Sequence, residues 1–294
     1  MTEATNAMVP GFKELTGTVP KIKIVDIGAN PIDGEAPYSP LLRAGLAHVV
    51  GFEPNPEALA KLEAQKGPND VYLPHAVGDG TSHTLNVCAA PGMTSLLPPN
   101  STVLNLFHGF PHWGNVVATQ EVDTVRLDDV PETAGLDLLK IDIQGGELMV
   151  FQNAEQRLND ALVIQSEVEF LPMYQGQPLF SDVDQFLRRR GFVLHRFFPE
   201  VSRVIQPLLV DNNIYAGLSQ IVWADAIFVR DFTRLDLLND RQLLNMAAIL
   251  HECYRSFDLV LHVLIELDRR TQNQLAANYL ARLTGKAPTN GLAA

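Results

Sequence analysis

The sequence predicts an α/β protein whose central, mostly parallel sheet carries helices on both faces. Apolar, β-branched runs of strand length alternate along the chain with stretches of helix length. Most of these runs lack the polar residues that a strand with one face in water would show. Such strands are typical of a parallel sheet that is covered on both faces by helices. The chain of 294 residues is long enough for one large domain with an extension.

Seven runs are predicted to form the strands of this sheet. A short helix ending near "LLRAG" (41–45) is predicted after the first strand, and three longer helices follow later. The strands are expected at 21–29, 48–54, 70–78, 136–143, 161–170, 192–197 and 223–231, and 83–90 is a further candidate. The helices are expected at 55–67, 145–159 and 181–191. Asn55 and Ser181 are their expected N-caps, and Gly67 and Gly191 follow two of the ends. Residues 91–115, rich in Gly, Pro, Ser and Asn, are expected to be loop.

The chain divides by composition into three parts. Residues 1–20 are polar with two prolines and form a loose lead-in, 21–231 form the α/β domain, and 232–294 form a helical extension. In the extension, Leu243, Met246, Ala247 and Leu250 share one helical face. Two or three helices are expected there, packed on the α/β domain or on a second copy of the chain.

The charge and the cysteine content narrow the classes of function. A net charge of −12 argues against non-specific binding to nucleic acid or to an anionic membrane. Cys88 and Cys253 provide neither a disulfide framework nor a metal set, which suits a reducing compartment. The N-terminal residues lack the basic and apolar regions of a signal peptide, and no run is long enough to span a bilayer. We therefore expect a cytoplasmic, soluble protein.

Two acidic residues near the ends of the first two strands indicate the kind of ligand. Glu53 lies 25 positions after Gly28, where an acid can accept hydrogen bonds from both hydroxyls of a ribose. The loop after the first strand lacks the G-x-G-x-x-G spacing of a dinucleotide site. Asp26, buried among β-branched residues, suits a cationic ligand better than a pyrophosphate. A cation with a ribose points to S-adenosylmethionine.

Five segments in order, "VDIGAN", "GFEPNPEAL", "HAVGDG", "VDTVRLDD" and "DLLKIDIQGGELMVFQNA", resemble the FkbM family of S-adenosylmethionine-dependent methyltransferases. The resemblance covers about 21–198, and the strand at 223–231 fits the same domain. It implies a class I methyltransferase fold, a Rossmann-like three-layer sandwich with a seven-stranded sheet whose last strand is antiparallel. It also implies O-methyl transfer, often to a sugar or natural-product hydroxyl.

The same resemblance assigns roles to individual residues. Asp26, Gly28 and Asn30 would line the methionine part of the cofactor. Glu53 would bind the ribose with Pro54 and Asn55 beside it, and His75 and Ala76 would flank the adenine. Asp142 would lie at the methyl-transfer centre. The chain departs from the family at Pro31, where the loop usually gains a second glycine, and at Gln144, where the family usually has a glutamate.

A hydroxyl acceptor must lose its proton, and Asp142 is the expected base or orienting group. Lys140, two residues earlier, points to the same side of the strand and could pair with it, or could instead be a long side chain at the sheet edge. Glu167 and Glu169 share a face at the end of a strand, where one of them could reach the acceptor site, but packing at a strand end is the simpler explanation. No second ligand for a divalent cation beside Asp142 is evident, so no metal is predicted.

Three functions remain open. The first is an S-adenosylmethionine-dependent O-methyltransferase acting on a sugar or other small metabolite, with Asp142 and Lys140 as catalytic residues. The second is a methyltransferase-like domain that only binds partners. The third is a nucleotide-cofactor oxidoreductase, which the missing glycine pattern disfavours.

Overall fold

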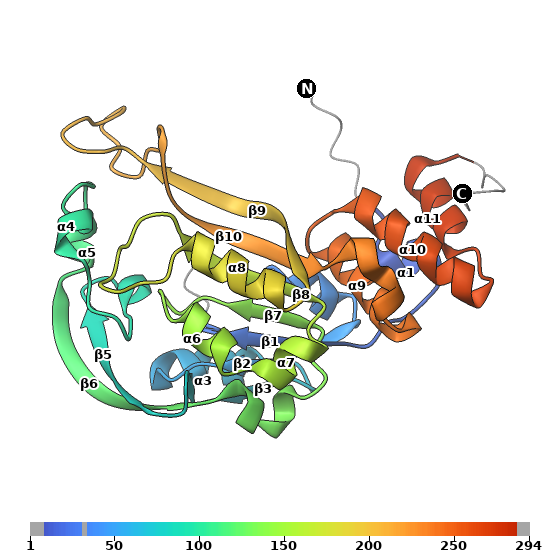
Figure 1. The fold of residues 1–294 in the computed structure, drawn as a ribbon, viewed down its shortest axis with the longest axis horizontal. Helices are drawn as coiled ribbons and strands as arrows, with labels where there is room; N and C mark the ends of the chain where they lie inside the picture. The colour runs from blue at the N-terminus through green and yellow to red at the C-terminus, as the bar shows by residue number, and fades with distance from the viewer. Residues whose placement is uncertain (1–8, 31–33, 287–294) are drawn as a thin grey trace. The chain divides into compact units, whose positions relative to one another are not determined.

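The computed structural model describes residues 9–30 and 34–286, and these residues group into two compact units. One unit lies within Met1–Ile22, Glu35–His48 and Phe232–Ala294, and the other within Lys23–Gly34 and Val49–Asp231. Most of the sheet belongs to the second unit (Figure 1). Pro31 lies outside the described residues.

A seven-stranded sheet forms the centre of the fold. Its strands in spatial order are β3 (Val71–Leu73), β2 (Ala47–Phe52), β1 (Ile22–Ile27), β7 (Leu138–Ile141), β8 (Val163–Glu169), β10 (Gln220–Arg230) and β9 (Phe192–Arg203). The pairs β2–β3, β1–β7 and β7–β8 are parallel, whereas β10 runs antiparallel to both β8 and β9. The last strand of the sequence is thus inserted antiparallel into the sheet, which confirms the predicted class I methyltransferase fold.

One face of the sheet is covered by helices of the same unit, drawn in front of it in Figure 1. These are α6 (Glu147–Gln152), α7 (Glu155–Asp160) and α8 (Phe180–Arg189). Phe151, Leu158 and Leu187 from these helices pack into one core with strand residues such as Ile27 and Ile141. Between β2 and β3 lies α3 (Pro56–Gln65), whose N-cap is Asn55 as predicted; the Asn55 side chain accepts hydrogen bonds from Glu57 N and Ala58 N.

A second, three-stranded sheet was not predicted. Its order is β4 (Ala76–Val77), β6 (Val116–Val125) and β5 (Ser82–Cys88). The prediction of one strand over 70–78 is wrong, because Pro74 separates β3 in the large sheet from β4 in the small one. Strand β6 was not predicted because most of its side chains are exposed, so its sequence shows no alternation of apolar and polar residues. The candidate strand at 83–90 is confirmed as β5.

Two helix predictions need correction. The helix expected over 145–159 is two helices, because it breaks at Asn153, whose side chain donates to the Met149 carbonyl (2.9 Å). Ser181 does not cap α8, which begins one residue earlier with Leu179 at the N-cap. There the Asp182 carboxylate accepts a hydrogen bond from Leu179 N (2.9 Å).

Shorter helices complete the sheet-containing unit, and the other unit is helical. The former are α4 (Ser101–Leu104), α5 (Phe110–Trp113), η1 (Pro91–Met93), η2 (Leu127–Asp129) and η3 (Pro131–Thr133). The latter contains α1 (Phe12–Thr16), α2 (Ser39–Arg43), η4 (Phe232–Leu237), α9 (Asp240–Glu252), α10 (Phe257–Thr271) and α11 (Leu275–Thr284). Leu243, Met246 and Leu250 are buried on α9, as their spacing predicts. Over the described ranges, none of the helices combines the length and the apolar character that crossing a membrane requires.

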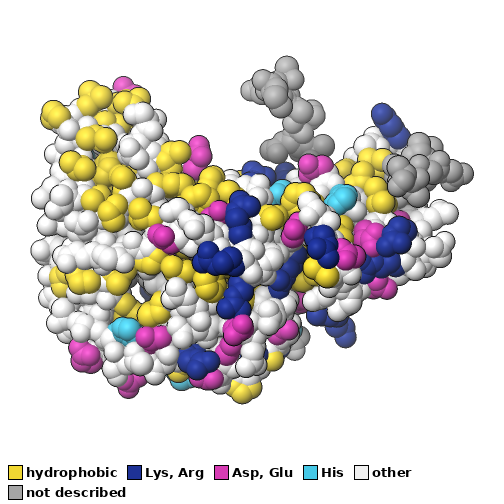
Figure 2. Space-filling view, in the orientation of Figure 1, with side chains coloured by type: hydrophobic (Ala, Val, Ile, Leu, Met, Phe, Trp, Pro, Cys, Tyr) yellow, Lys and Arg dark blue, Asp and Glu magenta, His cyan; other side chains and the backbone are white. Residues whose placement is uncertain are grey.

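The segment between β9 and β10 carries an exposed apolar surface together with the segment around α5. The two segments touch where Phe107 bridges to Ile205, and the Trp113 ring stacks on Tyr215 (5.4 Å, 14°). Figure 2 shows hydrophobic side chains gathered at this end of the unit, at the upper left. The exposed members in the two segments are Leu106, Val116, Val117, Ile205, Leu208, Ile214, Tyr215 and Leu218.

Candidate functional site

The carboxyl ends of β1, β2 and β7 meet at one edge of the sheet. Gly28 N, just past β1, donates to the Phe52 carbonyl at the end of β2 (3.1 Å). Asp142 N, just past β7, donates to the Ile27 carbonyl at the end of β1 (3.1 Å). Ligands of open α/β sheets bind at this edge, so the strand-end residues singled out from the sequence are neighbours here.

Gly28 allows the chains of β1 and β7 to approach closely. Its φ is +79°, and a Cβ at this position would lie 2.1 Å from the Asp142 carbonyl oxygen. Only glycine fits both the backbone conformation and the space. Asn30, two residues on, is partly buried.

Asp26 and Lys140 form a buried ion pair beneath this loop. They face each other in the β1–β7 register, and Lys140 Nζ lies 3.4 Å from Asp26 Oδ1 and donates to the Gly28 carbonyl (3.1 Å). Burial alone would lower the pKa of Lys140, but the charges of Asp26 and Asp142 raise it above its ordinary value. The ammonium is therefore a fixed positive charge whose direct partner is Asp26, with Asp142 acting on it by charge alone.

Glu53 is the buried acid at the end of β2. Its side chain is 5% exposed, and Oε1 accepts a hydrogen bond from Asn55 N (2.7 Å). Burial raises its pKa, which the Asn55 hydrogen bond partly offsets. Pro54 and Asn55, both exposed, lead directly into α3 and fix the turn that carries the carboxylate.

The residues expected to flank an adenine lie in the link between the two sheets. His75 is exposed, and Ala76 is the partly buried first residue of β4. Sequence reasoning missed Tyr72 in the adjacent β3, where burial, followed by the charges of Asp70 and Asp26, raises its pKa to about 12. Gly51 leaves room for this ring, since a Cβ there would lie 2.5 Å from two of its carbons.

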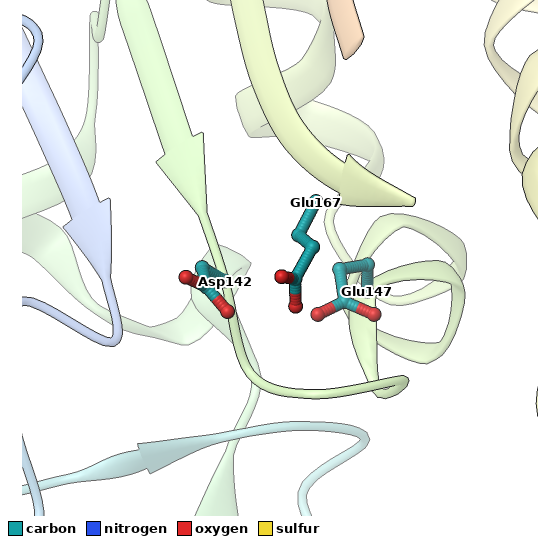
Figure 3. A group of neighbouring side chains, drawn as sticks. All are labelled: Asp142, Glu147 and Glu167. Carbon is teal, nitrogen blue, oxygen red and sulfur yellow. The ribbon is translucent and has the colours of Figure 1, made fainter. Parts of the chain in front are cut away.

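Three carboxylates converge between the ends of β7 and β8. Oxygens of Asp142, Glu147 and Glu167 lie within 4.8 Å of one another, and Figure 3 shows the three side chains pointing toward a common region. Glu147 is buried, and its two oxygens accept hydrogen bonds from Ile143 N (2.8 Å) and Gly145 N (2.9 Å). Burial raises its pKa to about 7 despite these bonds.

The side chain of Gln144 connects two of these carboxylates. Its Nε2 donates to Asp142 Oδ1 (3.0 Å) and to Glu167 Oε2 (2.6 Å). The amide nitrogen is a donor, so Gln144 links the two carboxylates by hydrogen bonds. Glu147 and Glu167 are also two possible cation ligands beside Asp142 that the sequence did not reveal. Burial and then the Asp142 charge raise the pKa of Glu167 well above its ordinary value. Burial and the Glu147 charge do the same for Glu169.

In the sequence, Gln144 stood out only as a departure from the family, and Glu167 was explained more simply by packing than by a role at the acceptor. Glu147 was given no role. The identity of Gln144 in "KIDIQGGE" was a signal, since an uncharged side chain follows Asp142 by two residues. Glu167 offered no comparable signal, because its neighbour across the site is 23 positions away in sequence.

The comparisons with known proteins agree with the motifs. The model of the "Methyltransferase FkbM domain" matches residues 26–194, more than half of the chain. The "2-O-methyltransferase NoeI" of Sinorhizobium fredii (strain NBRC 101917 / NGR234) is 27% identical over 180 residues, covering 55% of this chain and 69% of that protein. A precorrin-6y C5,15-methyltransferase structure from Geobacter metallireducens GS-15 aligns with 74% of this chain and 85% of its own at 15% identity and a TM-score of 0.36.

Proposed function

Because the chain belongs to the FkbM methyltransferase family, we propose that it moves the methyl group of S-adenosylmethionine to a hydroxyl of a sugar or another small metabolite. The main support is the buried Glu53 at the same sheet edge as Asp26 and Asp142. One acid suits the two hydroxyls of a ribose, and the others suit a cation. The similarity to a protein named as a 2-O-methyltransferase supports a hydroxyl acceptor.

The residues at this edge fit such a cofactor. Gly28 lets a ligand approach the backbone, and Asp26 and Asn30 supply polar groups for the methionine part. Glu53, with Pro54 and Asn55, would hold the ribose, and His75 and Ala76 would flank the adenine. The methyltransferase domain would then span 21–231, with 1–20 as lead-in and 232–294 as helical extension.

S-adenosylmethionine, when bound, supplies a methyl group for an in-line displacement by the acceptor oxygen. Asp142 would take the proton that the hydroxyl loses as its oxygen bonds to the methyl carbon. Lys140 would balance the buried charge of Asp26 through their 3.4 Å ion pair, and its charge also favours the ionised form of Glu53. Holding the acceptor in line is the larger part of the catalysis expected from such a site.

Calorimetric titration with S-adenosylmethionine, its demethylated product and NAD tests this proposal. We expect the first two to bind and NAD not to bind. Labelled cofactor is then screened against mono- and oligosaccharides and small hydroxylated metabolites, and we expect label in an ether-linked methyl group. Binding of NAD alone would favour an oxidoreductase. Cofactor binding without transfer to any acceptor class would favour a domain that only binds partners.

A further inference from the structure

The Gln144 side chain uses every hydrogen-bonding group of its amide. The two N–H groups point to Asp142 Oδ1 (3.0 Å) and Glu167 Oε2 (2.6 Å), and Oε1 accepts from the Tyr174 hydroxyl (2.9 Å). The Gln144 main-chain carbonyl also accepts from the Ser95 hydroxyl (2.7 Å). One residue thus joins the ends of β7 and β8 to two loop segments that pack together in a second hydrophobic core.

The orientation of this amide is determined by its partners. Tyr174 is fully buried, and its single hydroxyl proton can go to Gln144 Oε1 or to the Met93 carbonyl 3.2 Å away. A reversed amide would turn its oxygen toward the Asp142 and Glu167 carboxylates and remove the two N–H donors that they share. The two carboxylates therefore favour the orientation in which the NH₂ group faces them, and in that orientation Oε1 accepts from the Tyr174 hydroxyl.

The backbone of Gln144 adopts a conformation that is uncommon for a residue other than glycine. Its φ is +60°, in the left-handed region that a side chain with a Cβ disfavours, and it is followed by Gly145 with φ +100°. Such conformations persist where the contacts of the surrounding structure fix them, as the three side-chain hydrogen bonds of Gln144 do here.

We propose that Gln144 is a positioning residue that holds Asp142 in one orientation and stabilises negative charge on the Asp142–Glu167 pair. The proposal rests on the proposed function, which gives Asp142 the acceptor proton. Hydrogen bonds to an ionised carboxylate favour the charged form, so a donor shared by both acids lowers the cost of ionising the pair.

The other charged groups around the pair come from several elements. They are Lys140 on β7, Asp26 on β1, Glu147 on α6, Glu169 on β8 and Asp225 on β10. Among the residues described around the pair, the acids outnumber the cation Lys140, so the pair holds its proton strongly. The direction of the Glu167 pKa, raised by burial and by the Asp142 charge, puts that proton on Glu167. Without the amide, the pair would lose the donor that stabilises its negative charge.

The test is the pH profile of kcat/KM for Gln144→Met, a variant of similar length without hydrogen-bonding groups. We expect turnover at neutral pH to fall by at least tenfold and the acid limb to move upward by about one to two pH units, the scale of one hydrogen bond to a charged acceptor. The affinity for S-adenosylmethionine should change by only a few-fold. Gln175→Met, an exposed glutamine beside Tyr174, is the matched control and should leave the profile unchanged.

Tyr174→Phe supplies a second variant. It should move the acid limb in the same direction by less, and combining it with Gln144→Met should add nothing further, because both changes disturb the same amide. A uniform loss of activity with an unmoved acid limb would overturn the proposal, as would full additivity of the two changes.

Infrared spectroscopy gives a readout independent of activity. The band of the protonated carboxyl, assigned by its loss in Glu167→Gln, should persist to higher pH in Gln144→Met than in the wild type. An identical titration in both proteins would refute the role of Gln144. Wild-type protein that transfers no methyl group would instead refute the proposed function, whatever the band does.

Discussion

Replacing Gly28 by alanine tests how closely the ends of β1 and β7 must approach to form the site. The added methyl group would lie 2.1 Å from the Asp142 carbonyl oxygen, where ordinary contacts begin at 3.4 Å. Both strand ends are fixed, since Gly28 N bonds to the Phe52 carbonyl and Asp142 N to the Ile27 carbonyl. The overlap can be relieved only by moving backbone, by more than 1 Å.

The magnitude has two parts. Placing a residue with a Cβ at φ +79° destabilises the folded state by roughly 1–2 kcal/mol. Alanine also reduces the conformational entropy of the unfolded chain, which offsets about 0.4–1 kcal/mol of this cost. Overpacking against backbone adds about 1–3 kcal/mol. We therefore expect Gly28→Ala to lower the free energy of unfolding by about 2–4 kcal/mol and to weaken cofactor binding as well.

Gly135→Ala is the matched control, because Gly135 also has a positive φ (+72°) but no atom within 4 Å of its would-be Cβ. It should cost only about 1 kcal/mol. Urea unfolding followed by tryptophan fluorescence measures both, since Trp113 and Trp223 lie in the unit that contains the two glycines. If Gly28→Ala costs no more than Gly135→Ala, the close approach of β1 and β7 is not a constraint on the fold.

Three other changes separate the acids of the site. Glu53→Ala should lose two hydrogen bonds to a charged acceptor and so weaken S-adenosylmethionine binding, measured by calorimetry, by roughly 2–4 kcal/mol. Glu57→Ala, at an exposed position, should leave the affinity unchanged. Equal affinities of the two variants would remove Glu53 from the site. Asp142→Asn should lower kcat about 100-fold with a smaller change in cofactor affinity, whereas a parallel loss of both would make Asp142 a cofactor ligand. The Glu147 pKa of about 7 lies above its unfolded value of 4.5, so its contribution to stability is full below pH 4.5 and is lost as pH rises to about 7. In Glu147→Gln the unfolding free energy should therefore fall less steeply with pH over this range, by at most roughly 1.4 kcal/mol per pH unit. Urea titrations at several pH values measure this slope, and an unchanged slope would show that Glu147 does not titrate there.

Local patterns predicted most of the large sheet. The apolar runs of β1, β2, β7 and β8 and the Asn55 cap depend on residues a few positions apart, so their signals are in the sequence itself. The break at Pro74 was also readable, but the sheet to which each half belongs depends on pairing with distant strands. The exposed strand β6 had no apolar period to reveal it.

The sequence by itself placed Gly28, Glu53 and Asp142 at strand ends, because parallel strands turn to their helices at one edge whatever the details of packing. Only the tertiary structure decided how the side chains there pair. Lys140 bonds Asp26 because the β1–β7 register sets them opposite each other, and Gln144 reaches Glu167 and Tyr174 across 23 and 30 positions of sequence. The sequence shows the charge and the hydrogen-bonding groups of each residue. It does not show which residue becomes the partner, because the partners belong to segments far apart in the chain that come within a few ångströms of each other only in the folded protein.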